Sequence, residues 1–290
     1  MATFKQQSTT SLKLISEYRD KTVIILEGMI DVNLFRNYWF KHRLDKLDFI
    51  EPGHGIGCAG VIQNVKSYRQ NGVPVFGLVD RDKLQADQKW DLVWQTDDAI
   101  FDQALPYGPH IKVTRYWEIE NYLINPPVIE AHVCHRNKGR IPRSDHEVEN
   151  EYLEHAETLI PHAAMNVAKR ENGEPEFGDG QTSKFKNRDE VEKEYQQLKE
   201  AGKICALVWH NYQDAVPKVE AFAYGETSRQ KLSGLLRRIN GKAMLDRIKR
   251  KNKLSDDPTF FLAEAIRTRD SISQELIDFI DIFCCVNKAT

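Results

Sequence analysis

Short runs of apolar, β-branched residues alternate with segments of helical periodicity over the first 80 positions. TVIIL at 22–26, LDFIE at 47–51 and VPVFGLVD at 73–80 have the length of strands. The segments between them, DVNLFRNYWFKHRL and VIQNVKSYRQNG, carry apolar residues at helical spacing. Such alternation predicts βα units and therefore an α/β fold, with a mostly parallel sheet flanked by helices.

The pattern changes after Pro126-Pro127. The later apolar periodicity is helical and predicts helices over 146–169, 187–201, 228–239, 242–252, 259–268 and 273–286. We therefore expect a catalytic domain at 1–126 and a mainly helical accessory domain at 127–290. The polar stretch 170–187 is rich in glycine and proline, which predicts a mobile segment inside the helical lobe.

Composition narrows the class of protein without naming a function. The 290 residues are 41% hydrophobic and 29% charged, and no apolar run is long enough to span a bilayer. The first twenty residues lack the apolar core of a secretory signal, and the five cysteines form no C-x-x-C pair. These features predict a cytoplasmic protein with reduced cysteines, no membrane contact and no zinc ribbon.

Three carboxylates stand at the ends of predicted strands. Glu27 follows the first strand, and Asp80 and Asp82 follow the third, at the edge where ligands of parallel sheets bind. If the chain stays extended there, Asp80 and Asp82 point the same way. Because clustered carboxylates repel one another, we expect a divalent cation, and oxygen ligands favour Mg²⁺ or Mn²⁺.

The same residues carry a resemblance to a known family. ILEGMID and GLVDRD resemble the Glu-Gly and Asp-x-Asp motifs of TOPRIM domains in order and separation. RYWEIENYL at 115–123 resembles a Glu-x-Glu-Asn-Tyr-Leu stretch of stand-alone TOPRIM proteins, the AriB-like effectors of the PARIS antiphage system. The resemblance covers roughly residues 20–125 and implies a TOPRIM-like sheet.

The resemblance also implies roles for individual residues. Glu27 would be the metal-linked acid/base, and Asp80 and Asp82 would be catalytic metal ligands. Candidates for an outer or second metal site are Asp31, Glu118 and Glu120. About thirty residues separate Asp82 from Glu118, which is a departure from simpler TOPRIM patterns.

At the level of the whole protein, the resemblance implies a magnesium-dependent endonuclease. It would cleave tRNA as a toxin-like effector of abortive antiviral defence, with a separate ATPase subunit holding it inactive until a phage trigger protein is sensed. The sequence has no G-x-x-x-x-G-K-[ST] motif, so ATP hydrolysis would come from that other subunit. Pairing of TOPRIM nucleases further implies a homodimer.

A basic stretch at 236–251 is the best candidate for nucleic-acid contact. Its apolar residues indicate that one helix face is buried, so an ordinary solvated charged helix is the alternative. The candidate phosphate-binding residues are Arg237, Arg238, Lys242, Arg247, Lys249 and Arg250.

Other interpretations stay open. GIGCAG at 55–60 forms a G-x-G-x-x-G between a strand and a helix, with Asp80 twenty positions beyond, as in dinucleotide-binding folds. That interpretation leaves Glu27 and Asp82 unexplained. A TOPRIM-like DNase is a further alternative, and so is a non-catalytic nucleotide-binding or receiver-like regulatory module with Glu27 and Asp80 in an acidic pocket. Asp31 also has an ordinary role as a first-turn helix acid.

Overall fold

The computed structural model describes residues 21–178, 184–254 and 256–286, and it forms two compact units. Of the described residues, those within 1–80, 102–114 and 263–290 form the first unit, and those within 81–101 and 115–262 form the second. These units do not coincide with the predicted ranges 1–126 and 127–290. The difference arises because the chain leaves the first unit after Asp80, returns for a short strand, and comes back again with its C-terminal helix.

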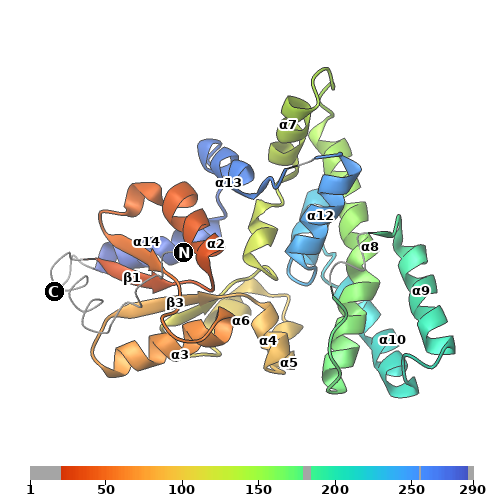
Figure 1. Cartoon of the computed structure of the whole chain (residues 1–290), viewed down its shortest axis with the longest axis horizontal. Helices are drawn as coiled ribbons and strands as arrows, with labels where there is room; N and C mark the ends of the chain where they lie inside the picture. Colours follow the sequence, from red (N-terminus) through yellow and green to blue (C-terminus); the bar gives the residue numbers. More distant parts are fainter. Residues whose placement is uncertain (1–20, 179–183, 255, 287–290) are drawn as a thin grey trace, which may run out of the picture. The chain divides into compact units, whose positions relative to one another are not determined.

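A four-stranded parallel sheet forms the centre of the first unit (Figure 1). Its order is β2 (Leu47–Ile50), β1 (Thr22–Ile25), β3 (Val75–Val79) and β4 (Ile111–Val113). The register pairs Ile25 with Ile50 on one side and with Gly77 on the other. The predicted α/β class is confirmed, and the sheet is consistent with a TOPRIM-like core.

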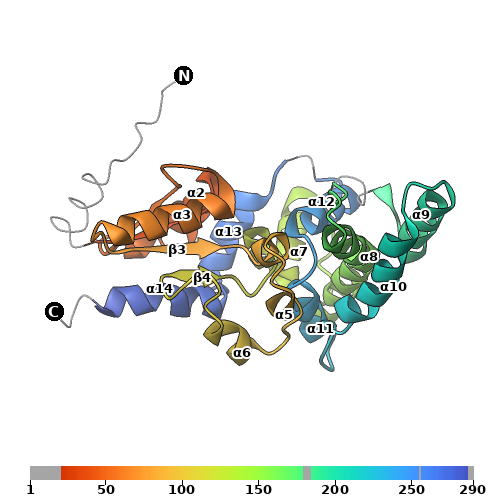
Figure 2. The same ribbon diagram turned by 90° about the horizontal axis from the view of Figure 1, so that it is seen from below.

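Helices of the first unit lie on both faces of this sheet. The two views place α3 on one face and α14 on the other (Figure 2). Short helical turns follow the first strand, and two further helices, α6 and α13, run from one unit into the other. The bounds are α2 (Met29–Asn33), η1 (Leu34–Trp39, a π-helix), η2 (Lys41–Arg43), α3 (Gly57–Gln70), α6 (Asp98–Gln103), α13 (Thr259–Thr268) and α14 (Gln274–Val286).

Alternation along β3 explains how both faces are packed. Gly77 faces α3 so closely that a Cβ there would lie 2.7 Å from Val61 Cγ1 and 2.9 Å from Val65 Cγ2. The neighbouring Phe76 points to the opposite face, where its ring lies 3.9 Å from that of Phe283 in α14. Glycine on one side and an aromatic ring on the other thus fit the strand between its two helices.

The second unit is helical and is organised around α8 (Asp145–Glu171). This long helix begins with a capping box in which Ser144 and Glu147 bind each other's backbone N–H groups, and its buried face packs against most other helices of the unit. The remaining elements are α4 (Asp82–Ala86), α5 (Trp90–Val93), η3 (Ile119–Leu123), α7 (Pro126–Arg136), α9 (Arg188–Glu200), α10 (Ala206–Glu220), α11 (Ser228–Leu235) and α12 (Gly241–Lys251). The predicted helical lobe is therefore present.

The predicted mobile segment 170–187 begins as the end of α8. Beyond that helix, the backbone N–H of Phe177 donates to Asn166 Oδ1 at 2.9 Å, and the Phe177 ring stacks on Tyr195 with centroids 5.6 Å apart. Residues 179–183 lie outside the described residues. The first part of the segment is thus bound to α8 and α9.

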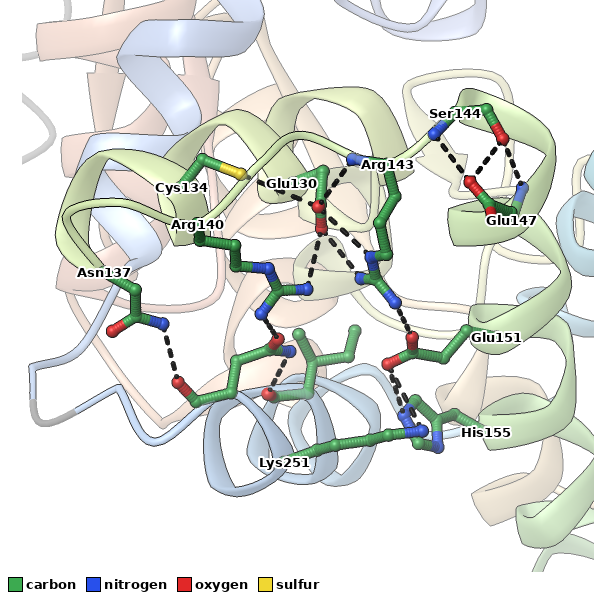
Figure 3. A network of polar contacts seen from close by, with 12 residues as sticks. Glu130, Cys134, Asn137, Arg140, Arg143, Ser144, Glu147, Glu151, His155 and Lys251 are labelled. Atoms are coloured by element: carbon green, nitrogen blue, oxygen red, sulfur yellow. Dashed lines mark hydrogen bonds and ion pairs between the residues drawn. The ribbon is translucent and has the colours of Figure 1, made fainter.

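A charged network joins α7 to the start of α8 (Figure 3). Glu130 is only 4% exposed, and its carboxylate accepts hydrogen bonds from Arg140 at 3.3 Å and from Arg143 at 2.7 Å. Burial raises the pKa of Glu130, but the hydrogen bonds from Arg143 outweigh it, so the pKa lies below its ordinary value. The network continues from Arg143 to Glu151 of α8. A buried carboxylate held by two arginines ties these helices together.

Among the described residues, none of the helices combines the length and the apolar character that crossing a bilayer requires.

Candidate functional site

Glu27 and Asp80 meet at the carboxyl edge of the parallel sheet in the first unit. Glu27 lies two residues beyond β1, and Asp80 directly follows β3. Oε1 of Glu27 accepts the backbone N–H of Asp80 at 2.8 Å. Both residues are half-buried. Two of the predicted site residues are therefore neighbours, and a hydrogen bond fixes the carboxylate of one against the backbone of the other.

The strand order makes this edge a favoured place for a ligand. In the order β2-β1-β3-β4, β2 lies on one side of β1, and the chain then crosses to the other side of β1 to form β3. Open α/β sheets bind ligands at the carboxyl ends of the two strands where this reversal occurs. Those strands are β1 and β3, which are followed by Glu27 and Asp80. The sheet topology and the acidic residues thus indicate the same site.

A third side chain, Cys58, completes the surroundings of Glu27. Its Sγ donates to Glu27 Oε1 at 2.5 Å from the first turn of α3. The adjoining Gly57 has a φ of +58°, and a Cβ there would be in ordinary contact with Glu27 Oε2, at 3.8 Å. Gly57 thus adopts a backbone conformation that side chains disfavour, beside the carboxylate. No local pattern indicates this role of Cys58, because its partner lies 31 positions away.

Asp31 lies in the first turn of α2, whose N-cap residue Gly28 has extended backbone. An acid in this place interacts favourably with the N-terminal end of the helix dipole. The structure therefore supports the ordinary helical role of Asp31, while its predicted metal role stays a prediction.

The expected extended path through Asp80 and Asp82 is wrong. Arg81 has α-helical φ and ψ of −64° and −28°, and Asp82 is the first residue of α4. Side-chain alternation therefore does not align the two aspartates. Asp82 belongs to the second unit, where its backbone N–H donates to the carbonyl of Trp117 at 3.2 Å.

Glu118 has a different partner set from the one expected of a metal ligand. It is 6% exposed and forms a capping box with Asn121 at the start of η3. Its Oε2 accepts the backbone N–H of Gly241 at 3.0 Å, and its Oε1 accepts Asn240 Nδ2 at 3.0 Å. These bonds place the carboxylate at the N-terminus of α12, where a negative charge is stabilised.

Lys242 pairs with both acids of the Glu-x-Glu segment. Its Nζ lies 3.3 Å from Glu118 Oε1 and 3.4 Å from Glu120 Oε1. All three residues belong to the second unit, and the lysine side chain is 58% exposed. Lys242 thus offsets part of the repulsion between the two carboxylates, while their metal role stays a prediction.

Most of the predicted phosphate-binding arginines are buried. Arg237 donates to the carbonyl of Thr96 at 2.7 Å, and Arg247 donates to that of Phe185 at 2.7 Å. Arg238 is 1% exposed. Burial lowers the pKa values of Arg238 and Arg247. These three side chains face the interior of the second unit, so Lys242, Lys249 and Arg250 are the ones that remain accessible among the six predicted phosphate-binding residues.

The residues at the sheet edge fit a magnesium ion. In the described ranges, no three His, Cys, Asp or Glu side chains come together as a complete metal-binding group. Mg²⁺ commonly uses only one or two carboxylates, and waters and substrate phosphate supply its other ligands. The half-buried carboxylates of Glu27 and Asp80 have the oxygen chemistry that such a site requires.

The dinucleotide interpretation does not fit the sheet order. The glycine loop at 55–60 follows β2, whereas Asp80 follows β3, and β1 lies between these strands. In a dinucleotide-binding fold, the acidic residue follows the strand next to the one that carries the glycine loop. The loop glycines instead pack on one another, since a Cβ at Gly60 would lie 3.0 Å from the carbonyl carbon of Gly55.

Comparisons with protein-family models, with curated proteins and with solved structures found no match.

Proposed function

We propose that this chain is a metal-dependent phosphodiesterase, an endonuclease whose reacting site is the sheet edge at Glu27 and Asp80. The observation that supports it most is the 2.8 Å hydrogen bond between Glu27 Oε1 and the Asp80 N–H. That bond brings two acidic residues together where β1 and β3 end, which is the ligand-binding position of this sheet order.

Residues of this chain would orient the reacting groups at this edge and would transfer protons there. A bound Mg²⁺ would supply water activation and charge neutralisation at the phosphate. The hydrogen bonds from Asp80 N–H and Cys58 Sγ orient the Glu27 carboxylate, so that it can accept a proton from the attacking water. Asp80 would hold the cation through its carboxylate.

The finer parts of the proposal rest on the resemblance of ILEGMID, GLVDRD and RYWEIENYL to AriB-like TOPRIM proteins. They are cleavage of tRNA, a toxin-like role in antiphage defence, control by a separate ATPase subunit and a phage trigger, a homodimer and a cytoplasmic location. The three cysteines whose side chains are described, Cys58, Cys134 and Cys205, form no disulfide, which agrees with a reducing compartment.

A second candidate is a receiver-like regulatory module. The strand order β2-β1-β3-β4, with acids after β1 and β3, suits an acidic phospho-acceptor pocket as well as a nuclease site. In that case Asp80 would accept a phosphoryl group from a small phosphodonor, and no nucleic acid would be cut.

The test uses purified wild-type protein and three variants with matched loss of one negative charge. Glu27→Gln and Asp80→Asn alter the proposed site, whereas Asp45→Asn alters an exposed acid that precedes β2 at the opposite edge. Cleavage of tRNA, other RNA and DNA would be followed with Mg²⁺ and with excess chelator, and new ends would be sequenced.

We expect magnesium-dependent cleavage by the wild type and by Asp45→Asn, with a loss of at least about 100-fold in Glu27→Gln and Asp80→Asn. Cuts in DNA alone would favour the DNase alternative. A protein that cleaves no nucleic acid but accepts a phosphoryl group on Asp80 would favour the receiver-like module. Cleavage that survives Glu27→Gln would contradict the proposed site.

A further inference from the structure

A cavity of about 330 Å³ lies within the second unit, and all the residues that line it belong to that unit. They come from α4, α8, α12, the segment that follows α8, and the segments that precede η3 and α12. The lining combines aromatic rings, amide groups and charged groups of both signs. Its size lies at the lower end of the range for small-molecule sites.

Arg238 is the buried cation of this lining. It is 1% exposed, its Nη2 donates to Gln85 Oε1 at 3.1 Å, and its guanidinium lies 4.1 Å from the centroid of the Trp117 ring. Within the part of the chain that the structure describes, its Nε and Nη1 have no hydrogen-bond partner. The guanidinium therefore contacts a neutral amide and an aromatic face, and the charge of Glu176, which also lines the cavity, offsets only part of the effect of burial.

A second buried guanidinium, that of Arg81, adds to the positive charge around Arg238. Arg81 is fully buried, and its hydrogen bonds go to the carbonyl oxygens of Arg115 at 2.9 Å, Leu92 at 3.0 Å and Gln95 at 2.6 Å. Burial, followed by the charge of Arg81, lowers the pKa of Arg238. Since arginine stays protonated in proteins, the charge of Arg81 adds to the cost of burying Arg238, and a negative charge close to Arg238 would reduce that cost.

Other polar groups of the lining already have protein partners. His162 Nδ1 and the Tyr195 hydroxyl are 2.7 Å apart, and Arg170 forms an ion pair with Glu176 at 2.9 Å. The lining carboxylates of Glu118 and Glu176 also have partners, so Nε and Nη1 of Arg238 are the donors that an oxygen of a ligand would satisfy.

We propose that this cavity binds a small molecule through an oxyanion, a phosphate or carboxylate group, that pairs with Arg238. A guanidinium binds such groups through parallel N–H donors, and a buried site strengthens the attraction. The proposal goes beyond the phosphodiesterase, because it concerns the second unit and involves neither Glu27 nor Asp80. It also replaces the predicted contact of Arg238 with nucleic acid by a contact with a small anion.

The test is thermal unfolding of the full chain without divalent metal, in chloride and in three oxyanions at matched ionic strength. The three probes show which kind of oxyanion binds: inorganic phosphate is a bare phosphate, adenosine monophosphate carries a nucleotide phosphate, and citrate carries carboxylates. The variants are wild type, Arg238→Met, and Arg250→Met as a control, because Arg250 is exposed on α12. We expect at least one oxyanion at saturation to raise the Tm of wild type and Arg250→Met by about 5 °C, and that of Arg238→Met by less than about 1 °C.

A second variant keeps the test informative if Arg238→Met fails to fold. Gln85→Glu places a carboxylate where the Gln85 amide now lies, 3.1 Å from Arg238 Nη2. This internal anion should make the stabilising oxyanion at least 10-fold weaker in calorimetric titration. Equal stabilisation of wild type and both Arg238→Met and Gln85→Glu, or no stabilisation of wild type by any of the three at millimolar concentration, would overturn the proposal.

Discussion

The backbone N–H of Gly241 donates to Oε2 of Glu118 at 3.0 Å, so a buried carboxylate occupies the N-terminus of α12. Oε1 of the same side chain accepts Asn240 Nδ2 at 3.0 Å. Glu118→Ala would leave these buried donors unsatisfied, so we expect the free energy of unfolding to fall by about 1–3 kcal/mol. Urea unfolding followed by circular dichroism measures it.

Lys242→Met provides the matched control for Glu118→Ala. The lysine contacts the same carboxylate at 3.3 Å, but its side chain is 58% exposed, and exposed ion pairs contribute less than about 1 kcal/mol. A loss for Lys242→Met as large as that for Glu118→Ala would show that the ion pair, rather than the helix terminus, accounts for the effect.

Two variants of Glu27 distinguish the effect of its negative charge on cleavage from the effect of its hydrogen bonds on stability. In Glu27→Gln, the amide oxygen can still accept the Asp80 N–H, whereas Glu27→Ala leaves this N–H and the Cys58 thiol without their acceptor. We expect Glu27→Ala to be less stable than Glu27→Gln by about 1–2 kcal/mol in chemical denaturation, with cleavage lost in both. Equal stability of the two variants would mean that these hydrogen bonds contribute nothing to folding.

The sequence pattern predicted those parts of the fold that depend on local periodicity. The runs at 22–26, 47–51 and 73–80 contain β1, β2 and β3, because buried parallel strands read as continuous apolar segments. β4 was missed because it has only three residues, Ile111–Val113. α10 was missed as well, and it contains Pro217, a residue that usually indicates the end of a helix.

The candidate site was predictable where topology alone brings residues together. Glu27 and Asp80 follow adjacent parallel strands, so their proximity follows from the predicted sheet. The contact of Cys58 with Glu27 depends on how the glycine loop folds back, which no local pattern encodes. The burial of Arg238 against Trp117 likewise could not be predicted, because charged residues in amphipathic helices are usually exposed.

At Gly77, the core of the first unit leaves no room for a side chain. A Cβ at this position would lie 2.7 Å from Val61 Cγ1 and 2.9 Å from Val65 Cγ2, so α3 would have to shift. We expect Gly77→Ala to reduce the free energy of unfolding by about 1–3 kcal/mol. Gly28→Ala is the control for steric crowding, because a Cβ there meets nothing within 4 Å, so its loss should be limited to the effect of alanine at the N-cap of α2.

The double variant Gly77→Ala/Val61→Ala tests the cause of that loss. Removing the Val61 methyl groups makes room for the added Cβ, so the double variant should lose less stability than the sum of the two single variants, with a coupling of about 0.5 kcal/mol or more. Strict additivity would show that crowding against Val61 is not the reason.

The carboxylate of Glu151 predicts a loss of stability in acid. The imidazole of His155, whose Nε2 lies 3.6 Å from Glu151 Oε1, and then the hydrogen bond from Arg143 lower the pKa of Glu151 to about 2, against an ordinary value of 4.5. A carboxyl whose pKa is lower in the folded state stabilises the protein above its unfolded pKa, and this contribution is lost as the pH falls through the folded pKa. The pKa of Glu130 is lowered as well and acts in the same direction.

We therefore expect the free energy of unfolding of the wild type to decrease as the pH falls from 4.5 toward 2. Glu151→Gln removes the titrating group, so its stability should be lower at neutral pH and should depend less on pH across this window. Glu154→Gln, at an exposed position of the same helix, should retain the wild-type pH dependence. Denaturant unfolding at several pH values measures all three proteins. Parallel curves for the wild type and Glu151→Gln would show that the network around Arg143 does not couple this proton to folding.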